Sequence, residues 1–514
     1  MAVKKKKPSA KIVPESVEVR MYNVGLGDSI LLTFHSKSGT KKLAHRVLID
    51  CGSTGRNSTD GPNLEQVAKE IVKDCGGKNA VLDALVVTHR HQDHMSGFGG
   101  AAGKILTENL RPKLIIQPWT EEPGAANPKA KANATEKAAA SYAFSLHDAQ
   151  EVTDSILKEI LVRRESGMDR ETDEAAIFYC QKNLPFSEGL TFKKAKETDD
   201  DDELLTGLNV ETLKNIDAIT NLTNWKWSSG TPERKWVQKD DLLKLGIPGL
   251  TVKVLGPIGP KRWKELDGKG SNLAEELWKK LQALRGVDQP ETTQPEPTQA
   301  KSENTDAEQV RFKEEYGTYG VPPIFPNAEQ VDDSEFKKDS VRWLREKLDL
   351  LRGDQLLQFV TVLDKHINNT SVVLLLEFGG FRMLFPGDAE VAAWQGIMSD
   401  AKAEASIEKI DLYKVGHHGS NNATPIKSLW EKLIADRDKD NPLHCVLSTQ
   451  TTKFQGSIPN KTLLETMLES DALHLVSTAY LDGETSAHAE EWSVVERGTG
   501  SKRVVMSYSR KFDV

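Results

Sequence analysis

The residues best suited to chemistry are three histidines and one aspartate that lie within six positions of the chain. The stretch HRHQDH contains His89, His91, Asp93 and His94, and it follows apolar residues typical of a buried strand. In extended backbone every second side chain points to the same side, so His89 and His91 should face the same way. Asp93 and His94 are expected at the start of a helix. Imidazoles with a carboxylate are ligands for zinc, manganese or iron, and Gly97 lets backbone pack closely behind them. The pattern predicts a catalytic metal site; a histidine-rich surface loop is the alternative.

The second half of the chain adds two motifs in which aspartate or histidine follows a strand-like run. FRMLFPGD places Asp388 after apolar residues, and IDLYKVGHHGS places His417 and His418 in the same way. A carboxylate at Asp388 can bridge two cations about 3.5–4 Å apart, although an aspartate there is otherwise an ordinary turn residue. Either histidine could bind metal or protonate a leaving oxygen, and two surface histidines are the alternative. Lys414 and Ser420, which flank the pair, are candidates to hold a phosphate oxygen.

The elements that must position these residues fall into two regions of α/β character. Residues 17–108 contain the strand-like runs SVEVRMYNV, SILLTFHS, HRVLIDCGS and LDALVVT. Residues 366–514 contain SVVLLLEFGG, FRMLF, IDLYKV, LHCVLST and a terminal hairpin-like pair in WSVVERGTGSKRVVMSYS. One more core strand, GLTVKVLGP, is expected in residues 246–260.

Two segments interrupt this pattern and are predicted to be insertions. Residues 109–245 read as mainly helical, with an alanine-rich amphipathic stretch and an acidic run. Residues 261–365 form the second insertion, in which 286–309 is rich in Pro, Gln, Thr and Glu and is predicted to be a flexible linker. Residues 1–16 are predicted to be a disordered basic tail. The chain is therefore expected to be one catalytic domain split by two insertions.

Composition sets limits on the function. With 514 residues and 38% hydrophobic content the chain can bury a large core, and a net charge of -8 argues against non-specific coating of nucleic acid. The N-terminal lysine run lacks a following apolar segment, and no stretch of about eighteen apolar residues is present, so we expect a cytoplasmic protein that does not enter a membrane. The four cysteines lie far apart without CxxC spacing and are expected to be reduced, buried thiols: Cys51, Cys75, Cys180 and Cys445.

These motifs, in this order, resemble those of the metallo-β-lactamase fold. THRHQDH resembles its HxHxDH metal motif, and VLIDCGS resembles its first motif, in which an aspartate, here Asp50, steadies the metal loop. MYNVGLGDSILL, NNTSVVLLLEFGGFRMLFPGDAE and LYKVGHHGS resemble three further motifs of the metallo-β-lactamase domain in ComEC-type DNA-uptake proteins: VGxGDS, NNxS with a terminal Gly-Asp, and KVxHHGS. The resemblance covers the two α/β regions and leaves out the insertions.

The resemblance implies an α/β fold, the αβ/βα sandwich of two mixed sheets with helices outside and metals at one edge. It implies one or two divalent metal ions, with zinc the first choice and manganese the second. The implied metal ligands are His89, His91, Asp93, His94, Asp388 and His418. The implied catalytic residues are Asp93, His418 and His417, and the supporting residues are Asp50, Asp28, Lys414 and Ser420.

The sequence departs from the family pattern at one expected ligand. ComEC-type domains usually carry a histidine-proline pair after the strand that follows HHGS, whereas this chain has Ile458 before Pro459. Many members of the wider fold use another histidine between the HxHxDH and Gly-Asp motifs. His147, on an amphipathic helical pattern, and His366, just before NNTS, are the candidates here, and the sequence leaves both open.

Three functions remain compatible with the sequence. The leading one is a metal-dependent phosphodiesterase or nuclease that acts on DNA, RNA or a nucleotide through an activated hydroxide, oriented or deprotonated by Asp93 and with a proton from His418 or His417. The second is hydrolysis of an ester, lactone, thioester or peptide at the same metal site. The third is a degenerate metal-binding interaction or effector subunit. The insertions are candidate surfaces for a protein partner or for homo-oligomer formation.

Overall fold

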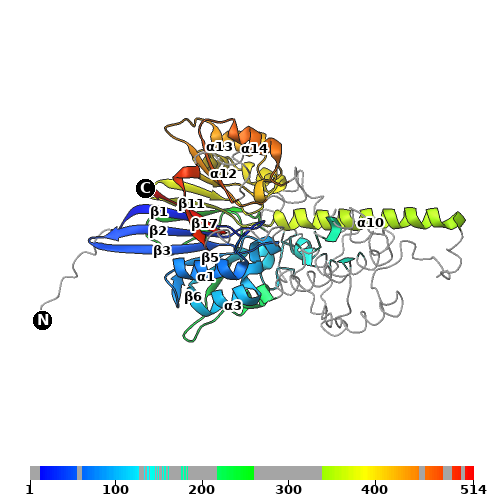
Figure 1. The fold of residues 1–514 in the computed structure, drawn as a ribbon, viewed down its shortest axis with the longest axis horizontal. Helices are drawn as coiled ribbons and strands as arrows, with labels where there is room; N and C mark the ends of the chain where they lie inside the picture. The colour runs from blue at the N-terminus through cyan, green and yellow to red at the C-terminus, as the bar shows by residue number, and fades with distance from the viewer. Residues whose placement is uncertain are drawn as a thin grey trace. The chain divides into compact units, whose positions relative to one another are not determined.

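The structure is a computed structural model that describes residues 12–54, 61–126, single positions and short stretches between 132 and 182, 217–259, 339–450, 458–478, 489–498 and 504–514. Figure 1 shows the fold of these residues. The linker predicted for residues 286–309 lies outside them, as does most of the predicted basic tail. The last residues of that predicted tail are instead part of a strand that begins at Ile12, because Val13 pairs with Lys37 of the next strand.

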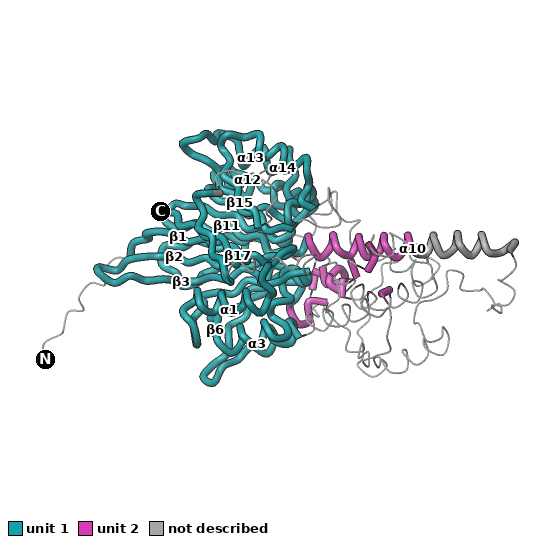
Figure 2. Tube along the Cα trace, viewed as in Figure 1, with its two compact units in different colours: residues 1–121, 217–258, 369–514 teal, residues 122–216, 259–368 magenta. Residues whose placement is uncertain are grey.

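The chain divides into two compact units (Figure 2). Unit 1 comprises Met1–Glu121, Asp217–Ile258 and Asn369–Val514. Unit 2 comprises Glu122–Ile216 and Gly259–Asn368. The two predicted insertions therefore contribute to one common unit, while the α/β regions form the other.

The first sheet of unit 1 has eight strands in the order β16-β17-β1-β2-β3-β5-β7-β8. The strands from β16 to β3 pair antiparallel, whereas β3, β5, β7 and β8 are parallel, so the sheet is mixed. The predicted terminal hairpin is confirmed as the antiparallel pair β16-β17. The strand bounds are β1 Ile12–Tyr22, β2 Ile30–Ser38, β3 Lys41–Ile49, β5 Ala84–Val86, β7 Leu114–Pro118, β8 Glu233–Val237, β16 Ser493–Arg497 and β17 Val504–Asp513.

The second sheet has seven strands in the order β15-β14-β13-β12-β11-β10-β9. Strands β12 to β15 are parallel, and β9 to β12 are antiparallel, so this sheet is mixed as well. The bounds are β9 Leu242–Leu243, β10 Leu250–Gly256, β11 Val373–Phe378, β12 Phe381–Phe385, β13 Leu412–Lys414, β14 Leu443–Leu447 and β15 Leu473–Ser477. A small parallel pair, β4 Ala80–Leu82 with β6 Leu110–Pro112, completes the sheets.

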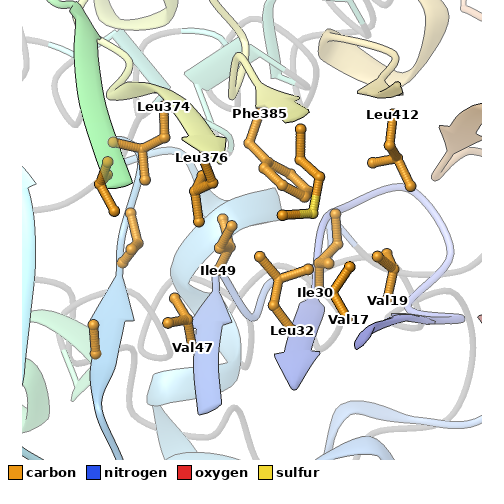
Figure 3. Close-up of a cluster of buried hydrophobic side chains, with 14 of the residues drawn as sticks. Val17, Val19, Ile30, Leu32, Val47, Ile49, Leu374, Leu376, Phe385 and Leu412 are labelled. Atoms are coloured by element: carbon orange, nitrogen blue, oxygen red, sulfur yellow. The ribbon is translucent and has the colours of Figure 1, made fainter. Parts of the chain in front are cut away.

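The two large sheets pack face to face through apolar side chains. Alternate residues of β2 and β3, among them Leu32 and Ile49, lie opposite residues of β11 and β12 such as Leu376 and Phe385 (Figure 3). All four are at most 3% exposed. Side chains in a strand alternate between faces, so this alternation fixes which face of each sheet turns inward.

Helices cover the outer faces of both sheets. On the first sheet, α1 Leu64–Asp74 and α3 Gly100–Asn109 share an apolar cluster with Leu31 and Leu48. On the second, Trp394 and Ile397 of α11 pack with Leu375 and Leu384. The helices of this layer are α11 Val391–Met398, α12 Ala401–Ile407, α13 Glu431–Ile434 and α14 Lys461–Leu468. The chain is thus α/β with mixed sheets, as expected, and the layers of unit 1 are helix, sheet, sheet and helix.

The boundaries of the first insertion differ from those predicted. Residues 110–118 form β6 and β7, and β7 pairs in parallel with β5 inside the first sheet, so the departure from unit 1 comes after Glu121 and not at residue 109. Residues 233–237 form the edge strand β8, so unit 1 resumes at Asp217. Short strands that follow a helical pattern carry too few residues for alternation to reveal them.

Unit 2 has its own apolar core. Residues of the first insertion, such as Leu146 and Ile160, pack with Leu356, Phe359 and Leu363 of the helix α10 Asp339–Asn368. The two segments are distant in the sequence, which explains why the sequence alone suggested two separate insertions. Among the described residues, no helix has both the length and the apolar character needed to cross a bilayer.

Candidate metal centre

The candidate ligands come from loops at the ends of strands in both sheets of unit 1. His89, His91, Asp93 and His94 follow β5 of the first sheet; the strand ends at Val86, earlier than expected, and helix α2 Gln92–Met95 starts after His91. Asp388 follows β12 and His418 follows β13 of the second sheet. All six of these side chains are at most 1% exposed. The fold therefore brings residues about 300 positions apart into one buried cluster.

Two groups of ligand atoms share Asp388. One consists of His89, His91 and Asp388, and the other consists of Asp93, His94, Asp388 and His418. Within each group the atoms that could bind a metal lie no more than 4.8 Å apart. A carboxylate common to two ligand groups is suited to bridging two cations.

The first group is built around a pair of imidazoles. His89 Nε2 lies 2.9 Å from His91 Nδ1, and the two rings meet edge to face at 77°. His89 Nε2 is 3.9 Å from Asp388 Oδ2. On its other side, His89 Nδ1 is 3.2 Å from the hydroxyl of Ser371, which also accepts a hydrogen bond from the Asp388 backbone N–H. Ser371, the serine of NNTS, thus links one ligand from each sheet.

The second group is oriented by hydrogen bonds behind the ligands. His94 Nδ1 lies 2.8 Å from Asp50 Oδ2, which directs its Nε2 toward Asp388 Oδ2 at 3.1 Å. His418 Nδ1 donates to the backbone carbonyl of Ser448 at 2.9 Å, and its Nε2 faces Asp93. Partners of this kind fix the tautomer and ring orientation of metal-binding histidines.

Asp50 is itself held by Thr88. The backbone N–H and the hydroxyl of Thr88 both donate to the Asp50 carboxylate, at 2.8 and 2.7 Å. Burial raises the pKa of Asp50, and the neighbouring His94 offsets part of that shift. The position that the sequence assigned to steadying the metal loop therefore contacts the loop through two residues, Thr88 and His94.

The buried carboxylates of the cluster favour a positive charge beside them. Burial opposes ionisation of Asp388, yet His94 and His417 hold the pKa of this carboxyl well below its ordinary value. Burial likewise disfavours protonated His94, but Asp388, Asp50 and Asp93 raise the pKa of this imidazole well above its ordinary value. Burial and the neighbouring His94 and His91 lower the pKa of His89. A divalent cation would satisfy the same carboxylates without a bound proton.

Buried polar atoms without a well-aligned hydrogen bond support this interpretation. Within the described part of the chain, neither carboxylate oxygen of Asp388 accepts a well-aligned hydrogen bond, and neither does His94 Nε2 take part in one. Buried polar atoms are nearly always satisfied in folded proteins, so atoms left over in one cluster fit a site that binds an ion or a polar ligand. Imidazole and carboxylate donors fit zinc or manganese.

His417 lies at the edge of the cluster and contacts a glutamate that the sequence did not single out. Its Nε2 is 3.8 Å from Asp388 Oδ2, and its Nδ1 is 3.5 Å from Glu390 Oε1. Glu390 is 6% exposed and follows Asp388 by two residues in PGDAE. Its position in that motif is the only sequence feature that could have identified it as a site residue. Both His417 and His418 adopt a left-handed backbone, with φ of 43° and 53°. Such strain in residues other than glycine is concentrated at functional sites.

Glycines allow the loops around the ligands to approach one another. A Cβ on Gly27 would lie 2.2 Å from the carbonyl oxygen of Gly52, and a Cβ on Gly52 would lie 2.4 Å from the backbone of Asp93 and His94. A Cβ on Gly97 would lie 2.5 Å from Cys51 Sγ. Only glycine fits where backbones pack this closely.

One of the two candidate phosphate contacts, Lys414, has surroundings unlike those expected for that role. Lys414 is 2% exposed, and its ammonium donates to Asp28. Asp28 is 3% exposed and lies beside His94, with its Oδ2 3.8 Å from His94 Nδ1. Ser420 accepts a hydrogen bond from the Asn422 backbone N–H at 3.4 Å. Lys414 is therefore bound within the protein and not directed at a substrate.

The two histidines left open by the sequence belong to unit 2. His147 is helical and half-buried. His366 lies on α10, where the Tyr142 hydroxyl is 3.4 Å from its Nδ1, and burial together with Lys365 lowers its pKa to about 4. Neither residue is a member of the ligand groups found among the described residues. Ile458, at the position of the expected family histidine, supplies no ligand atom.

Comparison of the sequence with models of known protein families and with curated proteins finds no match.

Proposed function

We propose that this chain is a metal-dependent hydrolase of the metallo-β-lactamase fold that cleaves phosphodiester bonds of a nucleic acid or nucleotide. The observation that carries the proposal is the pair of buried ligand groups that share Asp388. Two mixed sheets packed face to face, with helices outside and ligands in loops at strand ends, are the architecture that the sequence motifs imply for this fold. The nucleic-acid substrate follows from the resemblance to ComEC-type domains.

Bound divalent cations would supply a hydroxide nucleophile near neutral pH and stabilise the negative charge that develops on phosphate oxygens. The residues present suit zinc, or manganese as the second choice: His89 and His91 with Asp388 for one ion, and Asp93, His94 and His418 with Asp388 for the other. Asp388 would contribute to holding both ions. Asp93 is the carboxylate nearest His418 and would orient the attacking nucleophile.

His418 is better suited to binding metal than to donating a proton. Its Nδ1–H is already donated to the Ser448 carbonyl, and its Nε2 is directed at Asp93, so a leaving oxygen would find no free N–H on this ring. His417 is better suited to donating a proton. It lies near Asp388 without belonging to either ligand group, and Glu390 is close to its Nδ1. We assign His417 the protonation of the leaving oxygen from Nε2, with Glu390 orienting the ring.

The test begins with metal analysis of protein purified without chelators, followed by assays with bis-p-nitrophenyl phosphate, a lactone and a chromogenic β-lactam. Two zinc or manganese ions per chain with activity on the phosphodiester are expected. Activity on the lactone or the β-lactam alone would favour the second hydrolase class. Bound metal without activity on any of these substrates would favour the metal-binding interaction or effector subunit, and absence of both would contradict the metal centre.

Replacement of the shared carboxylate gives a sharper test. Asp388→Asn should retain the fold, because this side chain belongs to none of the apolar clusters found among the described residues, but it should lower metal content below two ions and abolish turnover. Circular dichroism would check the fold, and metal analysis the occupancy. An Asp388→Asn protein with two ions and the wild-type rate would show that the site has been assigned to the wrong residues.

A further inference from the structure

The ion pair between Lys414 and Asp28 connects the two sheets directly behind the ligands. Lys414 is the last residue of β13 in the second sheet, and Asp28 lies between β1 and β2 of the first sheet. The Lys414 ammonium donates to Asp28 Oδ2, and both side chains are buried. A second bond crosses at the same level, from the Ser448 hydroxyl to the Gly27 carbonyl.

Each end of this ion pair is fixed to one half of the ligand set. The Asp28 backbone N–H donates to the Asp93 carbonyl at 2.9 Å, and its carboxylate lies 3.8 Å from His94 Nδ1. On the other sheet, Lys414 is followed after three and four residues by His417 and His418. A change in the length of the Lys414–Asp28 contact would therefore move His418 relative to Asp93 and His94.

A contribution to the stability of the fold is a weak explanation for the buried Lys414–Asp28 ion pair. Removing two charges from water costs several kcal/mol per ion, and apolar replacements of buried ion pairs are often neutral or stabilising. The group formed by Asp28, Asp50 and His94 resembles a third metal site, but the Lys414 ammonium already supplies a positive charge to Asp28. The geometry that the pair imposes on the two sheets is therefore the role to examine.

We propose that Lys414 and Asp28 are positioning residues, whose ion pair sets the spacing between the ligands of the two sheets and thereby the affinity for the cation held by Asp93, His94, Asp388 and His418. The proposal rests on the metal centre of the proposed function. It extends that function by assigning to the KVxHHGS lysine a contact with the VGxGDS aspartate instead of a contact with phosphate.

The experiment compares Lys414→Met, Asp28→Asn and the double variant Lys414→Met/Asp28→Asn with the wild type. Co²⁺ titration in the presence of a competing chelator, followed by visible absorption, gives the two stepwise affinities. Urea unfolding of the metal-free proteins gives their stabilities. We expect each variant to bind one of the two ions about 10–100-fold more weakly, the range typical for residues behind metal ligands.

Stability and affinity should separate in the double variant. Each single variant leaves one buried charge without its partner and should unfold at a lower urea concentration, whereas the double variant should recover much of that loss because neither charge remains. Its Co²⁺ affinity should stay low, because the contact between the sheets is still missing. Recovery of affinity together with stability would show that the pair is merely structural and would overturn the proposal.

Lys239→Met is the matched control. Lys239 is also buried in unit 1, and its Nζ lies 2.9 Å from Asp400 Oδ2. Neither residue belongs to a ligand group found among the described residues. This variant should lose stability without a change in Co²⁺ affinity. If a single variant fails to fold, the double variant carries the test. Wild-type affinities in Lys414→Met would overturn only the positioning role, whereas a wild-type protein that binds no Co²⁺ would contradict the metal centre and the positioning role together.

Discussion

His418 Nε2 lies 2.9 Å from Asp93 Oδ2, although 325 residues separate the two in the sequence. Asp93 belongs to a loop of the first sheet and His418 to a loop of the second. The contact therefore joins the two sheets at the candidate metal centre, and it distinguishes His418 from its neighbour His417. The separation of roles between these adjacent histidines is the most direct mechanistic test that the site offers.

His418→Ala and His417→Ala should both lower turnover of a phosphodiester, but for different reasons. A lost ligand in His418→Ala should reduce metal content and slow all substrates alike. A lost proton donor in His417→Ala should leave two ions bound and cost about two to four powers of ten on a poor leaving group. That deficit should shrink with a nitrophenolate leaving group, which needs no protonation.

Metal analysis and paired substrates with good and poor leaving groups check this prediction. Equal deficits of His417→Ala on both substrates at full occupancy would rule out a proton donor and point to substrate positioning. Glu390→Gln should reproduce a milder form of the His417→Ala pattern, because Glu390 lies 3.5 Å from His417 Nδ1 and orients that ring. Full metal content in His418→Ala would contradict its role as a ligand.

Gly97→Ala should disturb the metal loop through its backbone. The added methyl would lie 2.5 Å from Cys51 Sγ and 2.6 Å from the Cys51 carbonyl oxygen, which accepts a hydrogen bond from the Gly97 N–H. We expect about 1–3 kcal/mol lower stability, together with weaker metal binding, since the Cys51 N–H also bonds the His94 carbonyl.

Gly230→Ala is the control for that prediction, because the nearest atoms its methyl would meet belong to the Trp227 side chain, at 3.2 Å or more. Urea unfolding and chelator competition would compare the two variants. If the Gly97→Ala protein binds metal as tightly as the Gly230→Ala protein, the metal loop can accommodate the added methyl group, and the prediction is wrong.

His366 should make unit 2 sensitive to acid. Its pKa is lowered by burial to about 4, below the ordinary value of 6.5, so the unfolded chain binds the proton more readily than the folded protein. Its contribution to stability is therefore fully present above pH 6.5 and is lost as the pH falls from 6.5 toward 4. Between pH 7 and pH 5 the loss amounts to about 2 kcal/mol.

His366→Leu should abolish this part of the pH dependence. Denaturant unfolding at pH 7 and pH 5, followed by proteolysis of unit 2 or by hydrogen exchange in α10, would measure it. The variant should lose about 2 kcal/mol less than the wild type over this interval. An unchanged pH dependence would mean that the imidazole is protonated or hydrated in the folded protein.

Local sequence predicted most strands of the two α/β regions and the candidate ligands, because both depend on short-range patterns. Alternation in SILLTFHS and the apolar run in SVVLLLEFGG indicated strands that the structure contains as β2 and β11. Imidazole and carboxylate groups behind such runs indicated metal chemistry at Asp93, Asp388 and His418. The same patterns indicated the α/β class, whereas the mixed sheets were expected only from the family resemblance.

Tertiary structure alone decided how those residues are combined. The sharing of Asp388 by two ligand groups and the hydrogen bond from His418 to Ser448 depend on which strand ends meet, and no local pattern encodes that. The burial of Lys414 against Asp28 could not be read from a lysine at a strand end, where exposure is the usual outcome. Strand formation needs only the alternation of side chains within a few residues. Contacts between distant segments depend on how the two sheets pack face to face, and the free energy of that packing is the sum over many side chains.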